Sequence, residues 1–456
     1  MKKLQLYNSL SNSLEDFIPL DANNVRIYAC GPTVYASPHV GNARPLVIFD
    51  ILFRLLKELY PKVTYVRNIT DVDDKINTRA RERKISIGEL TEEVTREFHK
   101  NTALLGVLPV THEPRATAHI WEMLNIIQKL ISNDFAYENQ GHVLFRVRKL
   151  TNYGILSKRN LDDMIAGSRV EIAPYKEDPM DFVLWKPSEE DTPAWDSPFG
   201  KGRPGWHIEC SAMSHKYLGE RFDIHAGGQD LMFPHHENEL AQNFGAFGCL
   251  MANYWIHNGM LLVNGQKMSK SLGNIISLED ALQQYDGEIV RYTLLSSHYQ
   301  KTLDWTDQLI AQSKQSLNRL YGALELSKSC SEIPFRQNQQ IVDALCGNLN
   351  TPLALHILRE IADAIYKSTS QSEINELGAQ LKNGAALLGL LYRKSEEWFR
   401  QENKLISEQE IGQLIADRKK AKSENNFQLA DKIRDELLKK NIQIEDTTDG
   451  TTWRNV

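Results

Sequence analysis

The sequence contains few cysteines and no long apolar segment. Its five cysteines are an odd number and form no Cys-x-x-Cys pair, which disfavours a disulfide framework and suits a reducing compartment. The first 17 residues carry two lysines without an apolar stretch behind them, and residues 385–392 are too short to cross a bilayer. We therefore expect a cytoplasmic protein with no signal peptide and no membrane association.

An excess of basic charge is also missing. The chain has 53 basic and 59 acidic residues and a formal net charge of −6, which argues against a wholly basic nucleic-acid coat but leaves local basic patches for RNA. Its hydrophobic and charged fractions, 41% and 25%, are those of a globular protein. Because one core rarely serves 456 residues, we expect about three domains.

The first part of the chain alternates strand and helix patterns. An apolar run at residues 25–29 precedes an amphipathic stretch at 41–60, and residues 63–69 again read as a strand. Ser86 and Glu89 then form a capping box that opens a further helix. This alternation predicts an α/β fold with a Rossmann-like, doubly wound parallel sheet.

Turn signals and helical periods divide the rest of the chain. Asn139-Gln140-Gly141 predicts a hairpin within an insertion, and four prolines between residues 187 and 205 indicate an irregular excursion. After Trp305 the pattern is helical, and residues 441–446 alternate like a strand. The predicted order is a first half of the catalytic sheet domain, an inserted connective subdomain, a second half, an all-α bundle and a small mixed α/β domain, at residues 1–115, 116–205, 206–304, 305–400 and 401–456.

Two segments suit phosphate chemistry. His39, Gly41 and Asn42 stand where the first strand meets its helix, and a helix N-terminus attracts phosphate. The alternative is a histidine that caps a helix beside a turn glycine. Lys267 and Lys270 lie in Lys-Met-Ser-Lys-Ser and offer two ammonium groups to the charge that grows on an α-phosphate. Alone, this segment could be a solvated surface loop.

A second constellation suits a metal ion. His235 and Glu239 are spaced i,i+4, so on a helix they share one face. Cys30 ends a predicted strand, and Cys210 lies in a stretch rich in His and Glu. Two thiolates, one imidazole and one carboxylate fit zinc. The alternatives are packed cysteines and a charged surface helix.

In this order, the two phosphate segments resemble the H-I-G-H-like and K-M-S-K-S signatures of class I aminoacyl-tRNA synthetases. Five further segments narrow the resemblance to the cysteinyl-tRNA synthetase family, and this resemblance covers essentially the whole chain. They are YACGPTVY at 28–35, NITDVDDK at 68–75, GWHIECSAM at 205–213, FPHHENE at 233–239 and DGTTWR at 449–454. One departure is Ala226, where the family more often has Gly in a H-G-G-G run, and alanine restricts the backbone there.

The resemblance implies particular roles for site residues. It implies zinc held by Cys30, Cys210, His235 and Glu239, with the thiol of the substrate cysteine bound to that zinc as thiolate, so that no editing site is needed. It places Cys30, Thr70 and Trp206 in the amino-acid pocket, although Thr70 could cap a helix and Trp206 could be a core aromatic. ATP, with Mg²⁺, is expected on seven residues: His39, Gly41, Asn42, Gly228, Asp230, Lys267 and Lys270.

The implied activity is ligation of L-cysteine to tRNA(Cys) through a cysteinyl-adenylate, by a monomer. Trp453 and Arg454 are expected to contact the anticodon, although Trp453 could instead anchor a small terminal core. One alternative is a cysteine ligase that acts on a small amine, but such relatives lack the region after about residue 400. A second alternative is a catalytically dead, zinc-stabilised RNA-binding protein, which the intact segment 267–271 disfavours. We expect Cys249, Cys330 and Cys346 to be packing residues.

Overall fold

The computed structural model describes residues 2–160, 173–269, 271–327, 338–399, 406–440, 442–447 and 450–455. The chain forms two compact units. The first comprises residues 1–310 and 339–355, and the second comprises residues 311–338 and 356–456.

A four-stranded parallel sheet forms the centre of the first unit. Its strands, in the order β10, β9, β3 and β4, are Ala252–Asn258, Phe222–Gly228, Val25–Ala29 and Val63–Arg67. All three pairings are parallel, which confirms the predicted doubly wound α/β class. The chain builds outward from β3 to β4 and later returns to the other side of β3 with β9. The order therefore reverses between β3 and β9, and a ligand crevice is expected at the carboxyl ends of these two strands.

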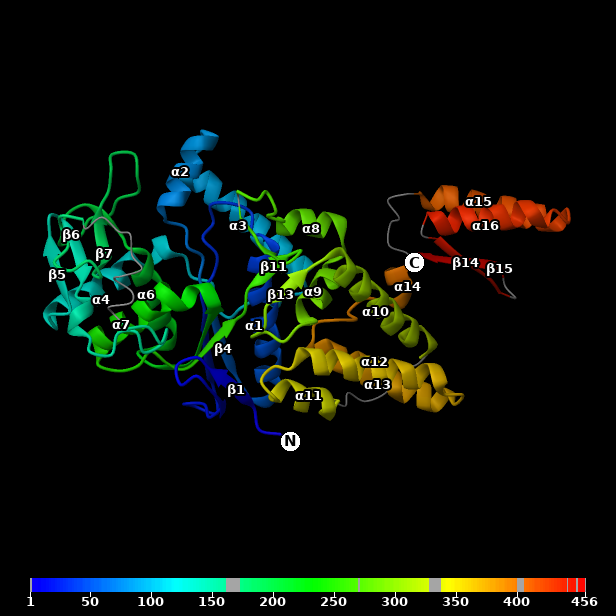
Figure 1. The fold of residues 1–456 in the computed structure, drawn as a ribbon, viewed down its shortest axis with the longest axis horizontal. Helices are drawn as coiled ribbons and strands as arrows, with labels where there is room; N and C mark the ends of the chain where they lie inside the picture. Colours follow the sequence, from blue (N-terminus) through cyan, green and yellow to red (C-terminus); the bar gives the residue numbers. More distant parts are fainter. Residues whose placement is uncertain are drawn as a thin grey trace. The chain divides into compact units, whose positions relative to one another are not determined.

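Helices pack around the sheet, and loops join the carboxyl ends of its strands to the helices that follow them (Figure 1). The helices of the first unit are α1 (Val40–Leu59), α2 (Asp74–Arg83), α3 (Ile87–Leu104), α4 (Ile120–Ser132), α6 (Trp206–Leu218), α7 (Glu237–Phe247), α8 (Leu278–Gln284), α9 (Gly287–Leu295) and α11 (Gln339–Cys346). The capping box predicted at Ser86 and Glu89 opens α3. One helical turn, Met232–His236, leads directly into α7.

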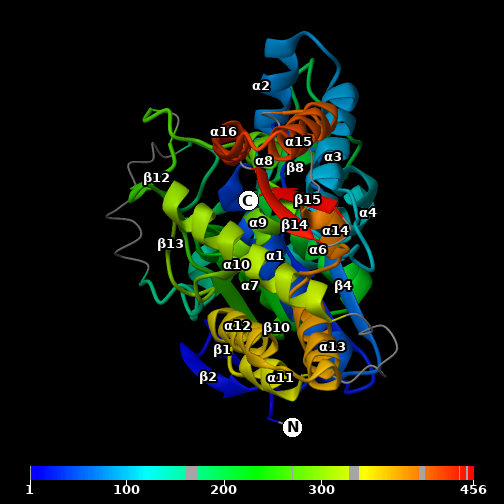
Figure 2. The ribbon, with the colours of Figure 1, turned by 90° about the vertical axis from the view of Figure 1, so that its right-hand side faces the viewer.

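Short strands complete the first unit. They are β1 (Gln5–Asn8) and β2 (Ser13–Asp16), which form a hairpin, and β11 (Leu261–Val263), β12 (Gln266–Lys267) and β13 (Leu303–Trp305), which form a small sheet. The β1–β2 hairpin lies beside α11 (Figure 2), where the Asn348 amide donates to the Gln5 carbonyl at 3.0 Å. A tight turn joins β11 to β12, and Asn264 and Gly265 have the positive φ angles, 50° and 76°, that such a turn requires.

The insertion forms an antiparallel sheet in the order β5, β6, β7 and β8: Ala136–Asn139, His142–Phe145, Phe182–Pro187 and Gly202–Pro204. The predicted hairpin is confirmed, with Gln140 and Gly141 at φ of 51° and 73°. The expectation of an irregular excursion up to residue 205 is wrong at its end, because Gly202–Pro204 pairs with β7. Proline is tolerated there because β8 is an edge strand.

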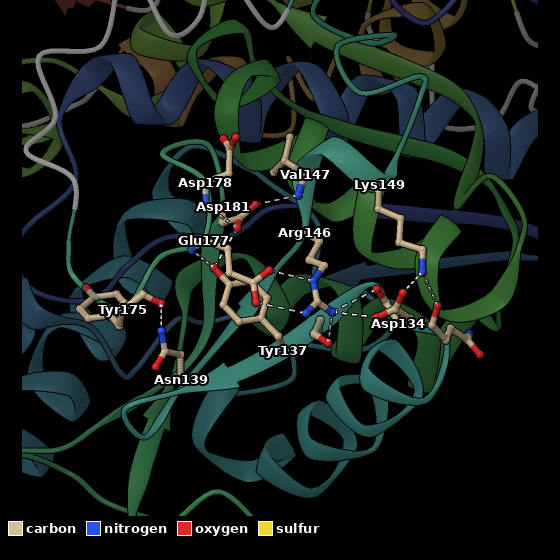
Figure 3. A network of polar contacts seen from close by, with 12 residues as sticks. Asp134, Tyr137, Asn139, Arg146, Val147, Lys149, Tyr175, Glu177, Asp178 and Asp181 are labelled. Carbon is tan, nitrogen blue, oxygen red and sulfur yellow. Dashed lines mark hydrogen bonds and ion pairs between the residues drawn. The ribbon is translucent and has the colours of Figure 1, made fainter.

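Polar contacts tie the β5–β6 hairpin to the segment before β7 (Figure 3). Arg146 bridges two carboxylates, at 2.8 Å from Asp134 and 3.1 Å from Glu177. Asp181 is buried and accepts hydrogen bonds from the Tyr137 hydroxyl at 2.8 Å and the Val147 amide at 3.0 Å. These bonds satisfy a carboxylate that would otherwise be costly to bury.

Helices dominate the second unit. They are α10 (Asp307–Leu326), α12 (Thr351–Lys367), α13 (Gln371–Leu387), α14 (Ser395–Phe399), α15 (Glu408–Ser423) and α16 (Phe427–Lys439); residues 307–310 of α10 and 351–355 of α12 belong to the first unit. A two-stranded antiparallel sheet, β14 (Ile442–Thr447) and β15 (Gly450–Asn455), follows α16. The helical pattern after Trp305 and the small α/β end are both confirmed.

Candidate active site

A cavity of about 490 Å³ opens at the carboxyl ends of β3 and β9, where the strand order reverses. Its lining joins two chemically different groups of side chains. Cys30, Cys210 and His235 are among the residues at the cavity wall, and so are His39 and Lys267. One cavity therefore brings soft metal-type ligands together with residues suited to phosphate.

Four side chains from different elements converge on a candidate metal group. Cys30 follows β3, Cys210 lies in α6, His235 lies in the turn before α7, and Glu239 lies in α7. Their ligand atoms lie within 4.8 Å of one another. Cys30 Sγ is 3.7 Å from Cys210 Sγ and 3.5 Å from Glu239 Oε1, and His235 Nε2 is 3.0 Å from the same Glu239 oxygen. This donor set of two sulfurs, one nitrogen and one oxygen is compatible with a metal site.

A second set of four shares Cys30 and Glu239 with the first but replaces the other two residues by His225 and His236. Both of these histidines are fully buried, and the cavity wall does not include them. His225 Nε2 lies 2.9 Å from Glu239 Oε2, and His236 Nε2 lies 3.3 Å from Cys30 Sγ. Of the residues in which the two sets differ, only Cys210 and His235 line the cavity, so His225 and His236 contact Glu239 and Cys30 from the buried side.

Close packing of the four side chains shifts the pKa of each of them. A hydrogen bond from Cys30 lowers the pKa of Cys210 to about 6, whereas burial raises the pKa of Cys30 itself. Burial opposes ionisation of Glu239, but the neighbouring histidines hold the pKa of this carboxyl well below its usual range. Burial works against a charged His235, and the Glu239 carboxylate nevertheless raises the pKa of His235 to about 10. At pH 7 the group therefore combines an anionic Cys210 and Glu239 with a neutral Cys30 and a protonated His235.

Trp206 and Thr70 border the metal group. Trp206 is the first residue of α6, and its ring stacks on His235 with centroids 4.4 Å apart and an interplanar angle of 17°. It is 42% exposed and lines the cavity, so it is not a core aromatic. Thr70 also lines the cavity, and the capping residue of α2 is Asp73, so Thr70 does not cap that helix.

The start of α1 forms the other side of the cavity. His39 caps this helix: the Asn42 amide donates to His39 Nδ1 at 3.2 Å, and the His39 amide donates to Asn42 Oδ1 at 3.0 Å. Burial lowers the pKa of His39, so its ring is neutral at pH 7. His39, Gly41 and Asn42 all line the cavity. His39 therefore both caps α1 and lines the cavity, so the two roles expected for it are compatible.

The Lys-Met-Ser-Lys-Ser segment follows the β11–β12 turn. Lys267 ends β12, and both Lys267 and Met268 line the cavity. Lys270 lies outside the described residues. Beyond this segment, the Val40 amide donates to the Ile276 carbonyl at 3.0 Å. The chain that follows the lysine segment is thus bonded directly to the start of α1.

Gly228 and Asp230, expected at the adenosine, also line the cavity. A Cβ on Gly228 would lie 2.4 Å from Asp230 Oδ1. The carboxylate of Asp230 therefore packs closely against the Gly228 backbone. Ala226 is fully buried in β9 and pairs with Ala29 and Ile256. The substitution at this position therefore lies within the sheet, two residues before Gly228.

The sequence is similar to one family of known proteins over nearly its whole length. Residues 16–315 match the model of the class I tRNA synthetase (C) catalytic domain. Cysteine–tRNA ligases from Rhodospirillum rubrum and Granulibacter bethesdensis are each 51% identical, over 99% and 98% of this chain and 99% and 95% of theirs. The chain belongs to the cysteine–tRNA ligase family.

Solved structures show the same fold at low sequence identity. Mycobacterium tuberculosis methionyl-tRNA synthetase in complex with methionyl-adenylate is 14% identical, with a TM-score of 0.56 over 80% of this ligase and 89% of that chain. At that identity the likeness concerns the class I fold alone.

Sequence reasoning missed Arg44 in α1. Its side chain is fully buried, and it donates hydrogen bonds to four backbone carbonyls, those of Gly259, Met260, His298 and Lys301. Burial lowers the pKa of Arg44 to about 10, still well above neutrality. Gly259 and Met260 line the cavity, so Arg44 fixes part of its wall. Only the place of Arg44 in the turn after Gly41 could have drawn attention to it.

The C-terminal residues have a packing role in the ligase structure. Trp453 is partly buried and packs against the apolar cluster of Ile406, Ile411, Ile433, Leu437, Ile442 and Ile444. The side chain of Arg454 lies outside the described part of the chain.

Cys346 is buried and Cys249 half-buried, whereas Cys330 lies outside the described residues. Among the described helices, none is both long enough and apolar enough to cross a membrane.

Proposed function

We propose that the protein activates L-cysteine with ATP, releases pyrophosphate, and transfers the cysteinyl group from the adenylate to the 3′ end of tRNA(Cys). The observation that carries this proposal is the cavity at the β3–β9 switch point. It joins Cys30, Cys210 and His235 to His39 and Lys267 within about 490 Å³. Membership of the cysteine–tRNA ligase family supports the same reaction. So does the chemistry of the two sides of the cavity, the cysteine- and histidine-rich side and the side with His39 and Lys267.

We propose that the metal group holds one zinc ion per chain, with Cys30, Cys210, His235 and Glu239 as the ligands. Two buried sulfurs, an imidazole and a carboxylate fit zinc, which accepts all three ligand types. When bound, zinc supplies a Lewis acid that favours a thiolate over a hydroxyl ligand and so distinguishes cysteine from serine. Trp206, stacked on His235, keeps that imidazole oriented toward the other ligands.

The phosphate end works through position and charge. The N-terminus of α1 and the ring of His39 are assigned to the ATP phosphates, with Asn42 beside them. Lys267 and Lys270 are assigned to the α-phosphate, where negative charge grows in the transition state. No side chain acts as a covalent nucleophile, because the substrate carboxylate attacks the α-phosphorus and pyrophosphate leaves.

The remaining substrate contacts follow from the same cavity. Thr70 and Trp206 are assigned to the amino acid, and Gly228 and Asp230 to the adenosine. Mg²⁺ is expected to accompany ATP. We further propose a monomeric, cytoplasmic enzyme whose C-terminal residues, including Trp453 and Arg454, contact the anticodon.

Pyrophosphate exchange with each amino acid in turn tests the proposal. Exchange that depends on cysteine and is at least about a hundredfold weaker with serine is expected, because the two side chains differ as metal ligands. Charging of tRNA(Cys) transcript with radiolabelled cysteine tests the second step. Protein that exchanges pyrophosphate with another amino acid, or that forms cysteinyl-adenylate without charging the tRNA, would contradict it.

A further inference from the structure

Asn68 lies immediately behind the cavity wall and contacts three residues that form it. It follows β4 directly and is 1% exposed. Its side chain reaches Gly31, Thr70 and Cys210, all of which line the cavity. One buried amide is therefore shared by the metal group and the neighbouring wall.

The neighbours of Asn68 fix the direction of its amide. The Gly31 backbone N–H lies 2.8 Å from Oδ1, and a backbone N–H can only donate, so the oxygen must face Gly31. Nδ2 then faces the other way and donates to Thr70 Oγ1 at 3.0 Å. Exchanging the two amide atoms would set two donors against each other at Gly31.

The backbone of Thr70 is held without any help from Asn68. Its amide donates to the Pro32 carbonyl at 3.0 Å, and its carbonyl accepts from the Val34 amide at 3.1 Å. What Asn68 controls is therefore the hydroxyl. Because Oγ1 accepts from Asn68, its own hydrogen remains to be donated, and the part of the chain that the structure describes offers this hydrogen no acceptor.

Cysteine has three polar groups, and they differ in what they can accept. The ammonium group has no lone pair, and the thiol belongs with Cys30 and Cys210 in the proposed reaction. Only the carboxylate is left to accept a hydrogen bond at Thr70. We propose that Asn68 is a positioning residue that keeps the Thr70 hydroxyl directed as a donor to the carboxylate of the bound cysteine. This inference rests on the proposed function.

Asn68→Asp tests the direction of this bond at nearly constant shape. The new carboxylate can still accept from Gly31 but cannot donate, so the Thr70 hydroxyl would donate to it instead of to the substrate. We expect the KM for cysteine in pyrophosphate exchange to rise about 10- to 100-fold, the range for a lost hydrogen bond to a charged group, while the KM for ATP stays unchanged. Thr70→Val should raise the KM for cysteine by a similar factor. The double variant should have the same KM for cysteine as Thr70→Val alone.

Three controls separate this role from a structural one. Zinc content should stay at one per chain, although Asn68 Oδ1 lies 3.8 Å from Cys210 Sγ. Cysteamine lacks the carboxylate, so its inhibition constant should be the same for wild type, Asn68→Asp and Thr70→Val. Thr70→Ser keeps the hydroxyl and should stay within about threefold of wild type.

Several results would overturn the assignment. An unchanged KM for cysteine in Asn68→Asp, additive effects in the double variant, or equal weakening of cysteamine and cysteine would each do so. If Asn68→Asp fails to fold, Thr70→Val and Thr70→Ser still decide between donor and packing roles through the cysteine and cysteamine constants. A wild-type protein that does not exchange pyrophosphate with cysteine would contradict the proposed function instead, so the two failures are distinguishable.

Discussion

The Cε methyl of Met268 lies 2.8 Å from the point that a Cβ on Gly41 would occupy. The two residues belong to the two phosphate segments, more than two hundred positions apart in the sequence. A side chain at Gly41 would force both the end of Met268 and the His39 ring, which lies 2.9 Å away, to move. The two segments therefore form one surface and should not be altered independently.

Gly41→Ala should impair cysteine activation. The added methyl would approach Met268 and also lie 2.9 Å from the His39 ring, which is held by its capping bonds. We expect a fall of about 10- to 100-fold in kcat/KM for pyrophosphate exchange, comparable to the cost of small misplacement at a reacting centre. Gly88→Ala is a matched control, since Gly88 is likewise the second residue of a helix and has nothing within 4 Å. Equal losses in the two variants would refute the contact.

Glu239→Ala should weaken metal binding and cysteine activation together, because both depend on the same four residues. Metal analysis of wild type should give one zinc per chain. The variant should lose zinc to a chelator at least about tenfold more readily. Cys249→Ala changes a cysteine outside the group and should leave zinc content unaltered. Active wild type without zinc would remove the specificity argument.

Lys270→Ala should slow adenylate formation far more than it weakens cysteine binding. On our assignment Lys270 meets charge that grows only in the transition state. Rapid-quench measurement of the single-turnover rate should show a loss of about 100-fold or more, with the dissociation constant for cysteine within about threefold of wild type. An unaltered activation rate would exclude the role.

A chain that stops at residue 400 should separate activation from transfer. The cavity is formed wholly by residues before 270, so cysteine-dependent pyrophosphate exchange should persist. Charging at low tRNA concentration should fall steeply, and tRNA binding should show a shallower dependence on salt than in the full chain, because phosphate contacts are lost. Full charging by the truncated protein would place anticodon recognition elsewhere.

Asp50→Asn should destabilise the first unit. Asp50 is 1% exposed and pairs with Arg291 and, at 2.8 Å, with Arg54. Burial opposes its ionisation, but the two guanidinium groups lower the pKa of Asp50. Removing the carboxylate charge takes the Asp50 counter-charge away from the fully buried Arg291, so we expect a loss of about 3 kcal/mol in urea unfolding at pH 7. Asp191→Asn, at an exposed site, is the control.

The sign of the pH dependence follows from the lowered pKa of Asp50. Its stabilisation is present above the unfolded value of about 3.9 and is lost as pH falls through the lower folded value. The difference in unfolding free energy between wild type and Asp50→Asn should therefore be constant from pH 7 to 5 and shrink below about pH 4. A difference that stayed constant down to pH 3 would show that Asp50 does not titrate in this way.

Local patterns predicted the sheet and the residues of the cavity well. The strand at 25–29, the turn at Asn264 and the spacing of His235 and Glu239 depend on neighbours within a few positions. What sequence could not give is which buried polar groups meet across the sheet. Asn68 reaches Gly31, and Arg44 reaches the loop after β10, only through the pairing of distant strands.

The strand Gly202–Pro204 illustrates the same limit. Proline and glycine punctuate a sequence locally, so they predicted an excursion there. Its pairing with Phe182–Pro187 depends on β8 being the last strand of the sheet, and edge positions are a property of the assembled sheet.

Cys30 and Glu239 are 209 positions apart in the chain. At translation rates of about 5 to 20 residues per second, roughly 10 to 40 seconds separate the synthesis of these two residues. Until β9 (Phe222–Gly228) has been made, β3 can pair only with β4. For most of that interval each newly made chain therefore carries Cys30 without the Cys210, His235 and Glu239 neighbours that surround it in the folded protein.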